Sequence, residues 1–181
     1  YDKETEKVHI PNEEIKREFS RTIRGVRRNE TIQRVRESDQ IISDTVHMNA
    51  DAVATQIEKI HIEETTALFY NNEQALRSVV IMAYLSSVDD YIRFEELASG
   101  KGYIDLFFLP ALQSSKPALI IELKWNKSAE KAVQQEQDQQ YWKFAKQFRY
   151  KGKILLVGIN YNSKTKKHTC KIKEIESLEK N

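Results

Sequence analysis

The chain has 181 residues, of which 40% are hydrophobic and 31% charged, and its formal net charge at pH 7 is +2. This composition allows one domain with its own core and excludes wholesale disorder. A single cysteine, Cys170, excludes an internal disulfide framework, and no apolar run approaches the roughly 20 residues that span a bilayer. The five glycines form neither a P-loop nor a Rossmann pattern. We therefore expect a cytoplasmic protein without membrane contact.

The first third of the chain is predicted to be helical. Asn12 and Asn29 are each placed to cap a helix that continues into an apolar stripe, and residues 50–62 match a third helix. None of these segments carries a catalytic pattern. We interpret residues 1–62 as a helical arm or connector. Because the chain begins at Tyr1 rather than at Met, we expect it to be part of a longer protein.

The rest of the chain predicts an α/β domain over residues 63–181. Residues 65–87 have helical spacing of apolar side chains, with Glu73 on the apolar face. The pattern then indicates strands at 91–97, 102–109 and 117–125, a long helix over 126–148, and strands at 153–161 and 168–175. A three-strand meander followed by a helical crossover predicts a mixed sheet flanked by helices.

Two charged residues interrupt the most apolar predicted strand. Glu122 and Lys124 share one face of residues 117–125, where unpaired charges are costly. If the preceding loop centres between residues 113 and 114, Asp105 lies directly opposite Glu122, and a one-residue slip would destroy this arrangement. Two carboxylates at roughly 5 Å repel each other unless a cation lies between them. The pattern predicts a Mg²⁺ or Mn²⁺ site with Lys124 beside it; a structural ion pair is the alternative.

These residues, together with longer matching segments, resemble the PD-(D/E)xK nuclease superfamily. The match is to the nuclease-type domain at the C-terminus of AAA-ATPase-like proteins, typical of anaerobic bacteria, and it covers about residues 63–176. It implies a restriction-endonuclease-like fold and a junction, near residues 11–15, to an ATPase part that is absent here. The matching segments are FYNNE at 69–73, ELASGKGYID at 96–105, PALIIELKW at 117–125, VGINY at 157–161 and KHTCKI at 167–172.

The resemblance also implies a role for each site residue. Asp105 and Glu122 would be metal ligands, Lys124 the catalytic lysine, and Glu73 a helix acid that assists the metal. Gln135 would be a helix glutamine near the site and Tyr141 the tyrosine that follows it. An exposed charge for Glu73, and ordinary packing for Gln135 and Tyr141, are the alternatives. The family usually has an apolar residue where this chain has Glu136, which would be either an extra ligand or a solvent-facing acid.

The C-terminal part of the chain is strongly basic. Residues 131–181 carry 12 basic and 5 acidic residues, a net charge of +7, and no acid lies between Asp138 and Glu174. Such a segment can bind a phosphate backbone, although a solvated lysine-rich face is the alternative. The residues assigned to nucleic acid are Lys143, Lys146, Arg149, Lys151, Lys164, Lys166 and Lys167.

Three functions remain open from the sequence. The first is a divalent-metal-dependent nuclease acting on DNA, with RNA as the alternative substrate. The second is a non-cleaving module that binds nucleic acid or a partner and regulates a fused or associated AAA-type ATPase. The third is an enzyme acting on small phosphoesters, which the basic segment disfavours. Paired cleavage would favour a homodimer.

Overall fold

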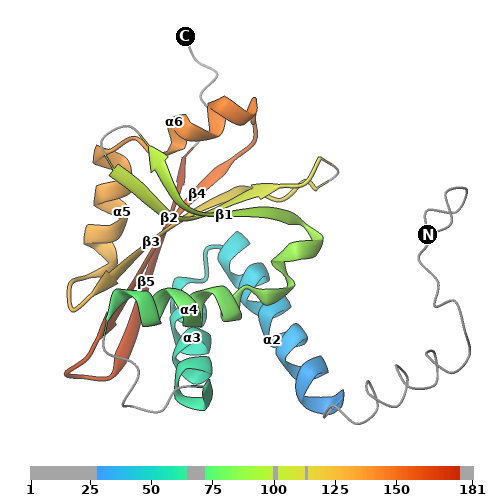
Figure 1. The fold of residues 1–181 in the computed structure, drawn as a ribbon, viewed down its shortest axis with the longest axis vertical. Coiled ribbons are helices and arrows are strands. Elements are labelled where there is room, and N and C mark those ends of the chain that lie inside the picture. Colours follow the sequence, from blue (N-terminus) through green and yellow to red (C-terminus); the bar gives the residue numbers. More distant parts are fainter. Residues whose placement is uncertain (1–27, 65–71, 100–101, 113, 176–181) are drawn as a thin grey trace, which may run out of the picture. The chain divides into compact units, whose positions relative to one another are not determined.

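The computed structural model describes residues 28–64, 72–99, 102–112 and 114–175 (Figure 1). The chain divides into two compact units, Tyr1–Arg36 and Glu37–Asn181. The predicted helix cap at Asn12 lies outside the described residues. Among the helices that are described, none is both long and apolar enough to cross a membrane.

The helices differ in extent from their predicted ranges. The prediction for residues 50–62 is confirmed, whereas Asn29 lies inside a helix that begins one residue earlier and therefore does not cap it. The helices are α2 (Arg28–Val46), α3 (Ala50–Glu64), α4 (Glu73–Ala83), α5 (Ala129–Asp138) and α6 (Trp142–Ala145), with short 3₁₀ segments η1 (Leu85–Asp89) and η2 (Lys146–Phe148).

Helix α4 begins at Glu73 because Asn72 caps it. The backbone of Asn72 is extended, and its side-chain oxygen accepts a hydrogen bond from the amide of Ala75 at 2.9 Å. The helix ends at Ala83, where the chain tightens into η1. The prediction of one helix over 65–87 is therefore too long at its C-terminal end, and residues 65–71 lie outside the described residues.

The strands confirm the predicted mixed sheet. They are β1 (Tyr91–Ser99), β2 (Gly102–Pro110), β3 (Ala118–Trp125), β4 (Ile154–Asn162) and β5 (Lys167–Ile175), and they lie in this order across the sheet. β3 and β4 are parallel and the other neighbours are antiparallel. A parallel pair needs a long crossover, which here contains α5 and α6. This is the restriction-endonuclease-like α/β architecture, with helices on both faces.

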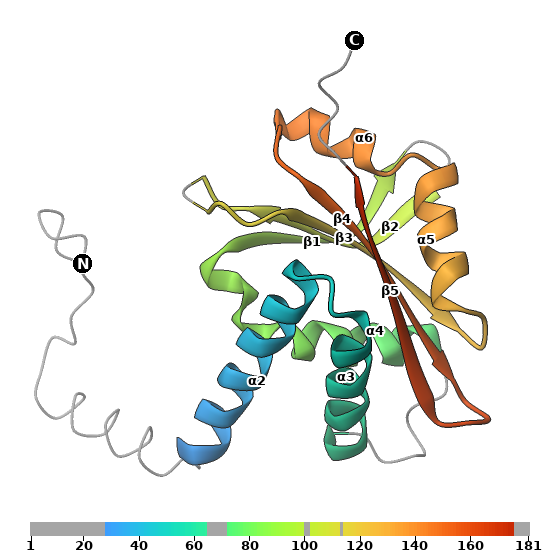
Figure 2. The same ribbon diagram turned by 180° about the vertical axis from the view of Figure 1, so that it is seen from behind.

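Two apolar clusters hold the sheet between its helices. Figures 1 and 2 show α3 and α4 on one face and α5 and α6 on the other. The first cluster joins the helix residues Ile57 and Val80 to β3 through Leu119 and Leu123. The second joins Val133 of α5 to Ile120 on the opposite face of β3. β3 is therefore buried on both faces, as its near-continuous apolar sequence predicts.

Gly158 lets α5 lie directly on the sheet. A Cβ atom at this position of β4 would lie 2.3 Å from the carbonyl oxygen of Ala129 and 2.8 Å from the Cβ of Ala132. Both atoms belong to α5, and the first is backbone that cannot move aside alone. Since Gly158 is paired with Glu122, this close approach sets the height of α5 above the candidate site.

We expect Gly158→Ala to lower the free energy of unfolding by roughly 1–3 kcal/mol, because overpacking forces α5 away from β4. Urea denaturation measures this change. The matched control is Lys171→Ala, at the exposed position paired with Gly158 on β5, which should change stability by about 0.5 kcal/mol or less. Equal stability of Gly158→Ala and the wild type would contradict this account of the packing.

Candidate active site

The alignment of β2 with β3 brings Asp105 and Glu122 together. The paired residues are Leu106 with Ile121, Phe107 with Ile120 and Phe108 with Leu119, which is the predicted register. The next position along this register sets Asp105 opposite Glu122. At this position the side chain of Asp105 contacts β3, since its Oδ2 accepts a hydrogen bond from the backbone N–H of Leu123 at 2.8 Å.

Glu122 has only one of its two oxygens satisfied. Its Oε1 accepts hydrogen bonds from Lys124 Nζ at 2.6 Å and from the amide nitrogen of Gln135. Its Oε2 is buried and has no hydrogen-bond partner among the described residues. Only 3% of Glu122 and 7% of Lys124 is exposed. A buried carboxylate oxygen without a partner is costly, and this oxygen is available to coordinate a cation.

The charges around Glu122 favour its neutral form. Burial raises the pKa of Glu122 to about 7, and the negative charges of Asp105 and Glu73 act in the same direction. The hydrogen bond and positive charge of Lys124 oppose this shift. The site therefore holds more negative charge than its own cations neutralise. Glu73, the first residue of α4, is half-buried and contributes through its charge.

Helix α5 is shorter than predicted, and its end carries Tyr141 back to the site. A single helix over 126–148 is wrong, because α5 begins after Ser128, whose side chain caps it, and ends at Asp138. Gln140 then adopts a left-handed φ of 54°. This turn buries Tyr141, whose hydroxyl lies 3.3 Å from the Gln135 amide nitrogen. Gln135 thus links Glu122 to Tyr141.

Arg77 is a site residue that the sequence analysis missed. Its Nη2 donates to Asp105 Oδ1 at 2.9 Å, and its Nη1 donates to a carboxylate oxygen of Glu96 on β1. It lies four residues after Glu73, and therefore on the same side of α4. That spacing is the one feature of the sequence that could indicate a role for Arg77, because its contacts with β1 and β2 join residues that are distant in sequence.

Glu136 lies inside the protein, which excludes the solvent-facing alternative of the two that the sequence leaves open. It is fully buried on α5, and neither carboxylate oxygen makes a hydrogen bond to a described side chain or backbone group. Burial raises its pKa well above the ordinary value, and the negative charge of Glu122 adds to the shift. The backbone N–H of Val157 lies near enough to the carboxylate to lower the pKa, although the two groups do not form a hydrogen bond of ordinary geometry. Burial and the charge of Glu122 thus disfavour the ionised form of Glu136.

The basic residues separate into groups at the two ends of β4. Arg149 and Lys151 precede the strand, whereas Lys164, Lys166 and Lys167 follow it. Nine residues of strand separate the two groups by roughly 26 Å. Because β3 and β4 are parallel, with Lys124 beside Asn160, the second group lies at the end of the sheet that carries Lys124.

The individual basic side chains are also placed differently. Lys167 forms an ion pair with Glu58 of α3 at 2.7 Å, so part of its charge is neutralised. Lys143 is exposed on α6, and the side chain of Lys146 lies outside the described residues. Lys164 and Lys166 are exposed in the β4–β5 turn.

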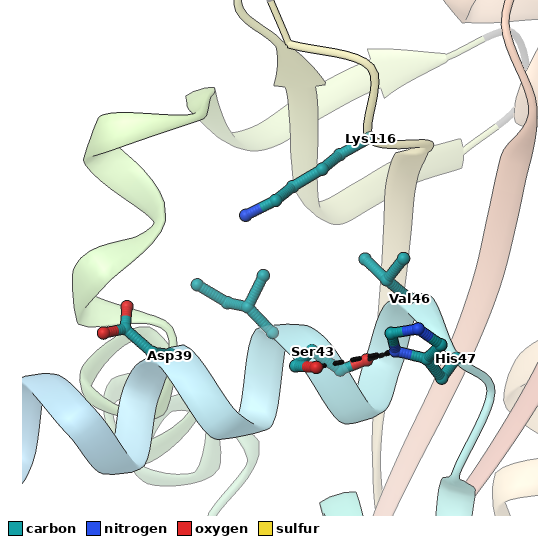
Figure 3. A pocket seen from close by; sticks show the side chains of 6 residues that line it. Asp39, Ser43, Val46, His47 and Lys116 are labelled. Atoms are coloured by element: carbon teal, nitrogen blue, oxygen red, sulfur yellow. Dashed lines mark hydrogen bonds between the residues drawn. The ribbon is translucent and has the colours of Figure 1, made fainter.

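A cavity of about 250 Å³ lies apart from these residues. Figure 3 shows it between α2 and the connection from β2 to β3. The His47 Nδ1 atom there contacts the carbonyl oxygen of Ser43 at 2.8 Å. None of the predicted site residues lines it. The lining residues are Asp39, Ile42, Ser43, Val46, His47 and Lys116.

The described residues contain no group of three or more histidine, cysteine, aspartate or glutamate side chains arranged to hold a metal ion. A metal ion held by Asp105 and Glu122 would therefore have only these two carboxylates as ligands from the described residues. Mg²⁺ usually takes one or two protein carboxylates and keeps several waters. A two-carboxylate site suits such an ion better than it suits Zn²⁺, which prefers nitrogen and sulfur ligands.

Comparison with known proteins gives one family match. The sequence model of the PD-(D/E)XK nuclease superfamily matches residues 71–171, which is more than half of the chain. This span includes every residue from Glu73 to Tyr141 in the site above. No curated protein matches the chain.

Stability should depend on pH through Glu136. A folded-state pKa above the unfolded value stabilises the protein at pH below the unfolded pKa, and this stabilisation is lost as pH rises through the folded pKa. Glu136→Gln should therefore match the wild type more closely at pH 5 and exceed it at pH 8 by roughly 1–3 kcal/mol. Urea denaturation at both pH values measures this. Glu130→Gln, at an exposed position of α5, is the control, and a pH-independent difference for Glu136→Gln would contradict the assignment.

Proposed function

Because the chain belongs to the PD-(D/E)XK nuclease superfamily, we propose that it is a divalent-metal-dependent nuclease that hydrolyses phosphodiester bonds in DNA. One observation carries the proposal. Asp105 and Glu122 meet at the end of the β2–β3 pairing, where Glu122 keeps a buried oxygen without a partner and Lys124 lies at 2.6 Å. This combination is costly for a site that serves only to stabilise the fold.

The residues fit a divalent cation. The unpartnered Glu122 Oε2 is a hard oxygen donor, and the pKa of Glu122, raised to about 7 by burial and by the charge of Asp105, would fall when a cation binds. Asp105 and Glu122 would hold Mg²⁺ or Mn²⁺, with Glu73 adding negative charge. When bound, such an ion supplies Lewis-acid stabilisation of the charge that develops on the phosphate.

The remaining side chains would orient the reacting groups. Lys124 Nζ is almost buried, and its remaining protons can be donated to a phosphate oxygen or to an attacking water. Gln135 donates to the oxygen of Glu122 that Lys124 also contacts, and Oε2 is left without a hydrogen-bond partner among the described residues. Tyr141 contacts Gln135 and limits its movement. Lys124 and Gln135 together would set the orientation of Glu122.

The basic turn supports a nucleic-acid substrate. Lys164 and Lys166 are exposed at the end of the sheet that carries Lys124, and phosphate contacts of this kind give affinity without sequence preference. DNA is proposed ahead of RNA. The AAA-type ATPase partner, the homodimer and the cytoplasmic location belong to the same proposal and rest on the family resemblance and the sequence.

A non-cleaving module is the second candidate, and one observation favours it. Each acid already contacts a cation of the protein itself, since Asp105 contacts Arg77 and Glu122 contacts Lys124. Such internal pairs can hold the site without a metal ion. The module would then bind nucleic acid or an ATPase partner.

We expect Asp105→Asn and Lys124→Met each to slow Mg²⁺- or Mn²⁺-dependent cleavage of DNA by roughly 100-fold or more. The first removes a carboxylate that would hold the cation, and the second removes an ammonium group that would stabilise the developing charge. Supercoiled, linear and single-stranded DNA are the substrates, and Asp138→Asn, at an exposed position at the end of α5, is the control. Cleavage by both variants at the wild-type rate would contradict the proposed site. A folded wild type that binds DNA without cleaving it would support the second candidate.

DNA affinity should depend on the β4–β5 turn more than on the other end of β4. Lys164→Glu should weaken binding. It should also reduce the number of counterions released on binding by about one, which lowers the dependence of affinity on salt. Lys151→Glu makes the same change in net charge at the far end of the strand and should have a smaller effect. Fluorescence anisotropy over a range of salt concentrations measures both, and equal effects would show that the turn is not the preferred contact.

A further inference from the structure

Arg77 joins three elements of the fold at the candidate site. Its guanidinium extends from α4 and donates one hydrogen bond to Glu96 of β1 and another to Asp105 of β2, at 2.9 Å. The side chains of Arg77 and Asp105 are only 12% and 13% exposed, whereas that of Glu96 is 62% exposed. The Nε of Arg77 is buried and makes no hydrogen bond to a described residue, and the guanidinium donates to these two carboxylates through its Nη atoms.

The sheet is distorted where Arg77 reaches it. The pairing of β1 with β2 includes Glu95 with Leu106 and Leu97 with Ile104, and it omits the intervening pair, Glu96 and Asp105. Glu96 also has a φ of 50°, a left-handed conformation that is rare for a residue inside a strand. Strained residues of this kind persist where surrounding contacts hold them and are concentrated at functional sites.

Two directional donors fix the plane of the Asp105 carboxylate. Arg77 Nη2 contacts Oδ1 and the Leu123 amide contacts Oδ2 at 2.8 Å. Each oxygen retains a lone pair, because a carboxylate offers about four acceptor positions. These two contacts therefore set the directions of the remaining lone pairs of Asp105, which lies opposite Glu122 in the register.

The charge of Glu96 preserves the attraction of the site for a cation. An arginine beside Asp105 alone would neutralise one of the two proposed metal ligands. With Glu96 included, three carboxylates (Glu96, Asp105 and Glu122) surround two cations (Arg77 and Lys124). At full ionisation the cluster remains negative. A planar fork can bind two carboxylates at once, whereas a lysine is a single point charge.

We propose that Arg77 is a positioning residue that orients Asp105 for metal binding, and that Glu96 holds Arg77 in place. The inference rests on the proposed metal-dependent function. The distortion of β1 then belongs to the site, because Glu96 is both the residue with the left-handed conformation and the residue that contacts the guanidinium. Arg77 acts through Asp105, because its hydrogen bonds within the described part of the chain go to Asp105 and Glu96 and to neither Glu122 nor Lys124.

The test compares Arg77→Met and Arg77→Lys with Arg93→Met, which removes an arginine of β1 paired with Glu95 at 3.1 Å. Two readouts are the electron paramagnetic resonance spectrum of bound Mn²⁺ and the rate of DNA cleavage at saturating Mn²⁺. Both Arg77 variants should change the Mn²⁺ spectrum and slow cleavage about 10–100-fold. The Mn²⁺ affinity of Arg77→Met should not fall, since a positive charge beside the ligand has been removed. Arg93→Met should resemble the wild type.

Several results would overturn the inference. Wild-type Mn²⁺ spectra and cleavage in both Arg77 variants would show that Asp105 needs no orientation, and full rescue by Arg77→Lys would show that charge alone matters. If Arg77→Met does not fold, Glu96→Gln provides the same test with the arginine retained, and an unchanged Mn²⁺ spectrum overturns the proposal.

Mn²⁺ binding and DNA cleavage by the wild type distinguish a failure of this inference from a failure of the proposed function. A wild type that binds Mn²⁺ but cleaves no DNA would refute the nuclease proposal, while the Mn²⁺ spectrum still decides the role of Arg77. A wild type that binds no Mn²⁺ would refute both.

Discussion

The register of β2 against β3 is the constraint on which the site depends. Because side chains alternate between the faces of a strand, a shift by one residue would turn Asp105 away from Glu122. The register is held by burial, since Leu106, Phe107 and Phe108 pair with an apolar run of β3 that is enclosed on both faces. The same apolar packing that stabilises the sheet therefore brings two acids together where the paired region ends.

The acids at this site repel one another, and the surrounding residues offset only part of that repulsion. Lys124 and Gln135 satisfy one oxygen of Glu122 and leave the other without a partner. Arg77 contacts Asp105 but also draws in Glu96. Glu136 adds a further buried acid whose pKa is raised by burial and by Glu122. Because the acids at this site outnumber the cations beside them, a bound divalent cation would relieve their mutual repulsion, which is why we propose one there.

The sequence was sufficient for the sheet and for the pairing of Asp105 with Glu122, because alternation and loop position are local signals. The end of α5 at Asp138 cannot be predicted in this way, since neither glycine nor proline marks it, although Gln140 adopts a left-handed φ of 54° just beyond it. Arg77 was missed because its partners lie on two strands that are distant in sequence. The sequence marks Glu136 as unusual but leaves it as either a ligand or a solvent-facing acid, and the structure shows that it is buried.

Anomalous X-ray diffraction from crystals of the protein soaked in Mn²⁺ would locate a metal ion at the site. We expect an anomalous peak within coordination distance of both Asp105 and Glu122, with the unpartnered Oε2 of Glu122 as a ligand. The peak should disappear in Glu122→Gln crystals. Saturating Mn²⁺ that gives no peak at these carboxylates, with Lys124 and Arg77 still paired as they are here, would contradict a metal-dependent active site.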